Sequence, residues 1–190
     1  MNKKCAVLSA PCILFLIILM FFSMLLRHLI SITSLPVTVT IIIPAVIVCL
    51  FLRENFWGLN SLALLLLLIV GLLLIGAGLI LFYLTISLFI TMGNGTIAPW
   101  SPTSKLIVGG VYRNVRNPMI TCVFLILTGE SMILGSIPVA IWTILFILAN
   151  LIFIPLIEEP ELAERFGDEY LIYKENVPRW IPRLSRWKKD

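Results

Sequence analysis

Two polar segments hold most of the residues of this chain that could do chemistry. The first, residues 109–119, reads GGVYRNVRNPM, and the second, residues 158–182, reads EEPELAERFGDEYLIYKENVPRWIP. Both carry arginine and tyrosine, and the second adds several glutamates; these side chains bind charged and polar ligands. The stretch between them is apolar and almost uncharged. If that stretch is a membrane hairpin, the two polar segments meet at one face of the bilayer and can form a site for a polar cofactor.

The first polar segment carries the signature of a helix start. Asn117 is a typical N-cap residue, and Pro118 fits the first helical position. The free N–H groups at such a helix end suit a carboxylate or a phosphate, and Arg113 and Arg116 stand beside them. A plainer interpretation is that these arginines and Tyr112 only anchor the chain at the membrane interface.

The second polar segment opens with two adjacent carboxylates, Glu158 and Glu159, at the end of an apolar run. At a helix C-terminus they oppose the helix dipole, so they need a cation, a hydrogen-bond donor or a new helix, which Pro160 can open. Beyond it, apolar and aromatic side chains recur on one helical face: Leu162, Phe166, Tyr170, Tyr173 and Val177. This pattern predicts an amphipathic helix that either lies on the membrane or covers a planar ligand as a lid.

The elements that must position these segments are membrane spans. The chain has 190 residues, of which 60% are hydrophobic, and a mean hydropathy of +1.08. A soluble domain could not bury that much apolar surface. We therefore expect an all-α integral membrane protein of one domain, residues 1–190, with about five transmembrane helices and no repeats. The predicted spans are residues 11–30, 35–52 (kinked at Pro44), 61–92, 118–134 and 137–157.

These spans divide the domain into four parts. Residues 1–92 form three N-terminal spans, 93–117 a cytoplasmic cofactor loop, 118–157 a tight helical hairpin, and 158–190 a cytoplasmic C-terminal cofactor segment. Most lysines and arginines then fall on the side of the C-terminus, which the positive-inside rule makes cytoplasmic. Lys3 and Lys4 run against this rule locally. The net charge of +4 does not indicate nucleic-acid binding, because the basic residues form no single patch.

Several other chemistries find no support in the sequence. His28 is the only histidine and falls at the end of the first span, so no Ser-His-acid set can be assembled. No G-x-G-x-x-G motif follows a strand, which argues against a Rossmann site. We expect no metal site and no disulfide, because the cysteines form no C-x-x-C pair and lie in or beside apolar runs: Cys5, Cys12, Cys49 and Cys122.

Two features of the spans have alternative interpretations. Gly71, Gly76 and Gly78 in the third span predict either close helix packing or a groove wall for a lipid-like chain. Glu130 lies inside the fourth span, where a carboxylate is costly. Since it is close to the hairpin tip, we expect it to reach the interface or to bond within the hairpin.

The ordered set of short motifs around the hairpin resembles the isoprenylcysteine carboxyl methyltransferase family, part of a wider group that includes membrane phospholipid methyltransferases. The resemblance covers about the last 90 residues. The matching residues are Leu106-Ile107, Gly110, Tyr112, Arg116, Pro118, Glu158-Glu159, Phe166-Gly167, Tyr170, Tyr173, Val177-Pro178 and Pro182. Two positions depart from the family pattern: Asn117 replaces a histidine and Ile120 replaces a tyrosine, so proton transfer at position 117 is excluded.

The resemblance implies S-adenosylmethionine as methyl donor, bound between the two polar segments. The implied cofactor contacts are Lys105, Leu106, Ile107, Tyr112, Asn117, Pro118, Met119, Ile120 and Glu158, with Glu159 and Tyr173 as weaker additions. The implied acceptor is a prenylated cysteine protein or peptide, or a similar lipid-like carboxylate that enters from the bilayer and is methylated to an ester. From their charge and location alone, and not from the resemblance, we expect Arg116 or Arg179 to hold its carboxylate.

Three alternatives stay open. A phospholipid amine methyltransferase would need a base to deprotonate the amine, whereas a carboxylate is already ionised near neutral pH. An NADPH-dependent membrane reductase would need a cluster of arginines for the phosphate, and only Arg113 and Arg116 are close together in the sequence. A non-catalytic membrane scaffold would bind no cofactor at all.

Overall fold

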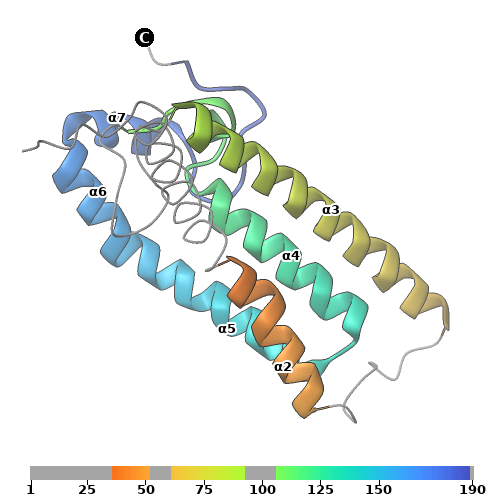
Figure 1. Cartoon of the computed structure of the whole chain (residues 1–190). Coiled ribbons are helices and arrows are strands. Elements are labelled where there is room, and N and C mark those ends of the chain that lie inside the picture. The colour runs from red at the N-terminus through yellow and green to blue at the C-terminus, as the bar shows by residue number, and fades with distance from the viewer. Residues whose placement is uncertain (1–35, 52–60, 93–105, 189–190) are drawn as a thin grey trace, which may run out of the picture.

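The computed structural model describes residues 36–51, 61–92 and 106–188. All regular structure within these ranges is helical, as expected for an all-α protein. Three long helices and the shorter α2 form a bundle, shown in Figure 1, and the polar C-terminal elements cap one of its ends. The predicted first span, residues 11–30, lies outside the described residues, as do Lys105 and His28.

The helix α3 (Ser61–Met92) is one continuous element of 32 residues, with the bounds that the sequence predicts. At 1.5 Å per residue it is roughly 48 Å long, longer than the ~30 Å hydrocarbon core of a bilayer. Large apolar side chains point outward along its length, including Leu62, Leu73 and Ile80. Such exposure is stable in lipid and not in water.

The predicted tight hairpin is confirmed. Helix α4 (Pro118–Leu134) ends at Gly135, whose φ of 58° and ψ of 25° lie in the left-handed region that favours glycine. Ser136 is extended, and α5 (Ile137–Phe153) begins at the next residue. The Gly135 N–H donates to the Ser131 carbonyl at 3.2 Å, which closes the end of α4.

Glycines set how closely α3 and α4 pack. A Cβ added at Gly129 would lie 2.6 Å from the Gly71 carbonyl oxygen, and one at Gly78 would lie 2.7 Å from Ile126. Gly76, in contrast, faces open space, with nothing within 4 Å of such a Cβ. Close helix packing is thus the role of Gly71 and Gly78, and it is not the role of Gly76.

Two prolines lie in or next to wide π-helical turns, and the helix continues there without a break. The turn η1 (Thr38–Ile42) leads into α2 (Ile43–Leu50), and Pro44 sits at the start of α2. The predicted kink at Pro44 therefore takes the form of a π turn, in which the Ile43 N–H donates to the Thr38 carbonyl.

A π turn also changes where the helix of the predicted fifth span ends. A second π turn, η3 (Ile154–Glu158), joins α5 directly to α6 (Glu159–Phe166), so one helix runs from Ile137 to Phe166. The helix therefore continues past residue 157, where the fifth span is predicted to end, and Pro160 lies in the first turn of α6 within this continuous helix. The Glu159 N–H donates to the Ile154 carbonyl, a wider spacing that carries the helix past Pro155.

The predicted amphipathic helix is two helices instead of one. Gly167, with φ 56° and ψ −138°, separates α6 from α7 (Asp168–Asn176), a backbone conformation open essentially to glycine alone. The residues of the predicted apolar face still pack together in spite of the break at Gly167. Tyr170, Tyr173 and Val177 are buried in one cluster. Packed against them are Leu106, Val108, Leu162, Ala163, Phe166 and Trp187.

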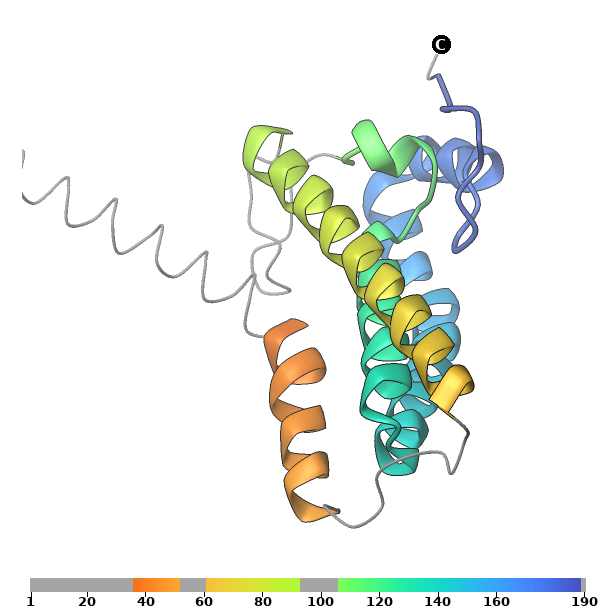
Figure 2. The same cartoon turned by 90° about the vertical axis from the view of Figure 1, so that its right-hand side faces the viewer.

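Within the described ranges, two helices are long and apolar enough to cross a membrane, Ser61–Leu88 and Ile137–Phe166. Two more are apolar but shorter, Thr38–Leu50 and Pro118–Leu134. The five-span topology stays a prediction, because part of it falls outside the described ranges. Figure 2 shows the polar elements η2, α6 and α7 at one end of the bundle and the hairpin turn at the other.

Candidate functional site

The first polar segment is held against the end of α3. It contains the short helix η2 (Gly110–Arg113), which starts at Gly110 with a φ of 49°. A Cβ at this glycine would lie 2.6 Å from a methyl carbon of Leu88, so the close approach and the backbone conformation both require glycine. The segment is thus fixed in place one turn before α4 begins.

The two polar segments meet, as the sequence predicts. The Arg116 N–H donates to the Pro178 carbonyl at 2.9 Å, and the Arg183 N–H donates to the Asn114 carbonyl at 3.0 Å. The Asn114 side-chain amide returns a hydrogen bond of 2.8 Å to the Arg183 carbonyl. Trp180 packs its ring 5.2 Å from that of Phe124 on α4, which seats the C-terminal segment on the hairpin.

Glu159 is the centre of the charged cluster that results. Its side chain is only 2% exposed and pairs with three cations. Arg179 makes a bidentate contact, with Nε at 2.5 Å and Nη2 at 3.0 Å from the two carboxylate oxygens. Arg116 Nη1 and Lys174 Nζ each lie 3.0 Å from the carboxylate. The carboxylate thereby ties α6 to the first polar segment, to α7 and to the C-terminal segment.

Arg116 and Arg179, the residues expected to position an acceptor, thus share an internal partner. The Arg116 side chain is 9% exposed, and its Nε is buried without a hydrogen-bond partner among the described residues. Three cations meet one carboxylate here, so the cluster carries a surplus of positive charge. A buried guanidinium with unused donor capacity is suited to bind an additional anion.

Glu158 has a different environment from its neighbour. It is half-buried, and within the described part of the chain its carboxylate has neither an ion pair nor a hydrogen-bond partner. It lies near Tyr112, whose pKa is raised by burial first and then by the nearby Tyr173 and Glu158. Tyr112 therefore stays protonated at neutral pH, able to donate a hydrogen bond, while Glu158 can accept one.

Tyr173 is buried next to this site and holds Tyr112 in position. It is 3% exposed, and its hydroxyl donates to the Tyr112 carbonyl at 2.7 Å. Its ring lies 5.8 Å from that of Trp187. In this structure Tyr173 is a buried link between α7 and η2.

The start of α4 is confirmed, but not the expected side-chain cap. Pro118 occupies the first helical turn and Asn117 precedes it, yet the Asn117 side chain makes no capping hydrogen bond. Its φ of −119° and ψ of 62° lie outside the extended region from which a capping side chain normally reaches the next turn. The Asn117 carbonyl instead accepts bonds from the N–H and the hydroxyl of Thr121. The first turn of α4 therefore has no capping bond from the Asn117 side chain.

The remaining predicted cofactor contacts surround these groups. Leu106 packs on the tyrosine cluster of α7, and Ile107 is half-buried beside it. Met119 and Ile120 are half-buried in the first turn of α4. Lys105 lies outside the described residues. The structure thus brings Tyr112, Glu158, Glu159 and Tyr173 into one neighbourhood with the start of α4.

Sequence reasoning missed Lys174 and Trp187. A single straight helix places Lys174 off the aromatic face, but the break at Gly167 turns α7 and brings this lysine to Glu159. Trp187 belongs to a non-helical segment with no periodic signal. The only local hint is the pair of prolines, Pro178 and Pro182, which exclude a helix there.

Over the described residues, the fold is an all-helical, membrane-associated bundle with a cluster of charged residues at one end. The family model for phospholipid methyltransferases matches residues 66–169, more than half of the chain, and the chain belongs to that family. No curated protein matches the chain. The match spans α3, the first polar segment, the hairpin and α6, and it implies methyltransferase activity in a membrane setting.

Proposed function

We propose that this protein transfers the methyl group of S-adenosylmethionine to the carboxylate of a lipid-like acceptor, such as a C-terminal prenylated cysteine, and forms a methyl ester. The observation that carries the proposal is the surplus of positive charge around Glu159. Arg116, Arg179 and Lys174 converge on this one carboxylate. A group of three cations around one carboxylate can attract a second carboxylate.

The chain's residues fit the donor. The N-terminus of α4, where the Asn117 side chain makes no capping bond, suits the carboxylate of its amino-acid part, because N–H groups and the helix dipole favour a negative charge there. The unpartnered carboxylate of Glu158 suits its ammonium group or its ribose hydroxyls. Leu106 and Ile107 offer an apolar surface for the adenine, beside the protonated hydroxyl of Tyr112.

The reaction asks little of side chains. When bound, S-adenosylmethionine supplies a sulfonium methyl group that is already activated. The acceptor carboxylate is ionised near neutral pH, so no residue has to remove a proton. The work of the chain is to hold the two reactants in line and to exclude water. In this proposal Arg116 and Arg179 hold the acceptor carboxylate, and its hydrocarbon chain enters sideways from the bilayer between the helices.

Methylation of a phospholipid amine is the second candidate, favoured by the family match itself. That reaction requires a base to take the amine proton. Within the described residues, the unpartnered carboxylate of Glu158 is the group that could do so. The two candidates therefore assign opposite tasks to Glu158: donor binding in the first, and proton removal in the second.

Methyl transfer by the purified protein separates the candidates. Radiolabelled S-adenosylmethionine is offered with N-acetyl-farnesylcysteine or with phosphatidylethanolamine. The proposal predicts a base-labile product with the farnesylcysteine acceptor and no transfer to the amine lipid. A base-stable product formed from phosphatidylethanolamine alone would overturn the carboxylate assignment and keep the family. If the protein methylates neither acceptor and shows no saturable binding of S-adenosylhomocysteine, the assignment of S-adenosylmethionine as the donor would be overturned as well.

A further inference from the structure

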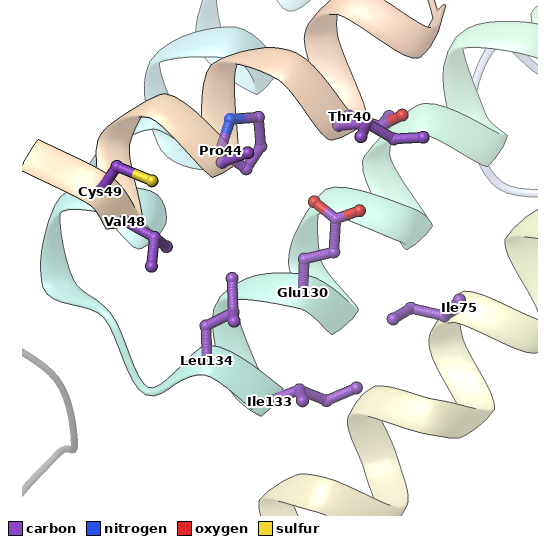
Figure 3. A pocket seen from close by; sticks show the side chains of 10 residues that line it. Thr40, Pro44, Val48, Cys49, Ile75, Glu130, Ile133 and Leu134 are labelled. Carbon is purple, nitrogen blue, oxygen red and sulfur yellow. The ribbon is translucent and has the colours of Figure 1, made fainter. Parts of the chain in front are cut away.

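A second candidate binding site lies at the other end of the bundle. A groove of about 430 Å³ runs between α2 and α4, with Ile75 of α3 at its edge (Figure 3). The α2 wall extends from Thr40 to Cys49, and the α4 wall includes Glu130 and Leu134. The volume falls in the range of small-molecule sites. The lining is apolar apart from Glu130 and the Thr40 hydroxyl.

Glu130 points into this groove toward α2 (Figure 3). Its Oε2 is buried and has no hydrogen-bond partner among the described residues. Two polar donors on η1 and α5, the Thr40 hydroxyl and Trp142 Nε1, are already committed to backbone carbonyls. The Thr40 hydroxyl donates to the Pro36 carbonyl at 2.8 Å, and Trp142 Nε1 donates to the Val39 carbonyl at 3.3 Å. The expectation that Glu130 bonds within the hairpin is thus not met by this oxygen.

An unpartnered carboxylate oxygen in apolar surroundings is energetically costly. A ligand that brings a hydrogen-bond donor removes this cost. Because the lining is apolar and the single charge is negative, the ligand must combine a hydrocarbon part with a cationic donor. An ammonium group has three donors and the complementary charge.

The groove is separate from the methyl-transfer site. Glu130 lies twelve residues after Pro118 on α4, which is roughly 18 Å along the helix. It is close to the hairpin turn at Gly135, at the end opposite η2 and α7 (Figure 2). In a hairpin that spans the bilayer, this position is near the surface opposite the polar cluster.

We propose that the groove binds an amphiphile with one hydrocarbon chain and a protonated amine headgroup. The ammonium pairs with the carboxylate of Glu130, and the chain lies along α2 between Thr40 and Cys49. This stretch of α2 gives roughly 14 Å of apolar wall. The site is independent of the proposed reaction, since it shares no residue with the cluster around Glu159.

Cys49 is exposed and lines the groove, so it reports on occupancy. The full chain in phosphatidylcholine nanodiscs is alkylated with N-ethylmaleimide, and the Cys49 peptide is followed by mass spectrometry. Dodecylamine should slow alkylation at a concentration about tenfold lower than dodecanol does, because a hydrogen bond between charged groups is stronger than a neutral one. Glu130→Gln should remove this difference and leave the rate without amphiphile unchanged.

A second variant guards against a folding artefact. Ala45→Phe fills the groove while Glu130 stays in place, and it should abolish protection by dodecylamine without lowering the melting temperature. Equal protection by the amine and the alcohol would overturn the proposal, as would an unchanged preference in Glu130→Gln or full protection in Ala45→Phe. A Cys49 that is already unreactive without any amphiphile would also overturn it, since another part of the chain would then fill the groove.

Discussion

At the residue scale, two adjacent glutamates have different tasks. Glu159 is buried and pairs with three cations, which holds the polar segments together. Glu158 is half-buried and has no ion pair among the described residues, so it is available to a ligand. In the proposed function Glu159 is accordingly a positioning residue, and Glu158 is the one of the pair that would bind the donor.

Glu159→Gln should destabilise the protein strongly. It leaves buried Arg116 and the partly buried Arg179 without their counter-charge, and breaking such a buried pair typically costs about 3–5 kcal/mol. The melting temperature in detergent, followed by circular dichroism, measures the loss. Glu164→Gln on the exposed side of α6 is the matched control and should change little. Equal melting temperatures for the two variants would refute the central role of Glu159.

Tyr173→Phe should act on the site through Tyr112. It removes one hydroxyl and the 2.7 Å bond to the Tyr112 carbonyl, at a cost of about 1 kcal/mol in stability. Because η2 then loses a tether, we also expect weaker binding of S-adenosylhomocysteine, which isothermal titration detects. Tyr83→Phe, on the exposed side of α3, should affect neither quantity. Unchanged affinity in Tyr173→Phe would show that the link does not position the site.

The sequence identified most residues of this site but not their partners. Arginines and a Glu-Glu pair in two polar segments are visible in the sequence. Whether Glu158 or Glu159 pairs with the cations depends on the direction in which the helix points each side chain. That direction is set by the π turn η3, for which the sequence offers only Pro155 as a hint. Lys174 reaches the cluster only because Gly167 redirects α7.

At the element scale, the contact between α3 and α4 is the packing that fixes the hairpin. Gly129→Ala should destabilise the fold by about 1–3 kcal/mol, because the new methyl group meets the Gly71 backbone at 2.6 Å. Gly76→Ala is the control on α3, where the added methyl group meets nothing within 4 Å and alanine favours the helix. Thermal unfolding in detergent compares them. A Gly129→Ala variant as stable as Gly76→Ala would contradict the close helix contact.

Element boundaries were predictable where the chain carries local stop signals. Asn117-Pro118 fixes the start of α4, and Gly135 fixes its end. The end of α5 was not predictable in this way. Prolines normally stop helices, but here π turns carry the helix past them into α6, and the actual break comes at Gly167.

At the scale of the whole molecule, the hairpin turn and the polar cluster occupy opposite ends of the bundle (Figure 2). The meeting of the two polar segments was predictable, because an apolar hairpin returns the chain to the side where it began. The backbone pairing of residues 114–116 with 178–183 was not, since it has no sequence period.

This arrangement predicts a labelling pattern across the membrane. In a cysteine-free background, Ile137→Cys at the hairpin turn should react with an impermeant maleimide added outside intact cells. Ser185→Cys, near the polar cluster, should react only after permeabilisation, because the positive charges of that end favour the cytoplasm. Reaction of Ser185→Cys in intact cells would reverse the predicted orientation.

The most direct test of the whole account is the affinity of the purified protein for S-adenosylhomocysteine, compared between the wild type and Glu158→Gln. We predict saturable binding that falls about tenfold or more in the variant, which corresponds to one lost charge-assisted hydrogen bond. The melting temperature should stay close to that of the wild type, since Glu158 pairs with no described residue. Glu164→Gln should bind as the wild type does. Unchanged affinity in Glu158→Gln, or no saturable binding by the wild type, would contradict the donor site described above.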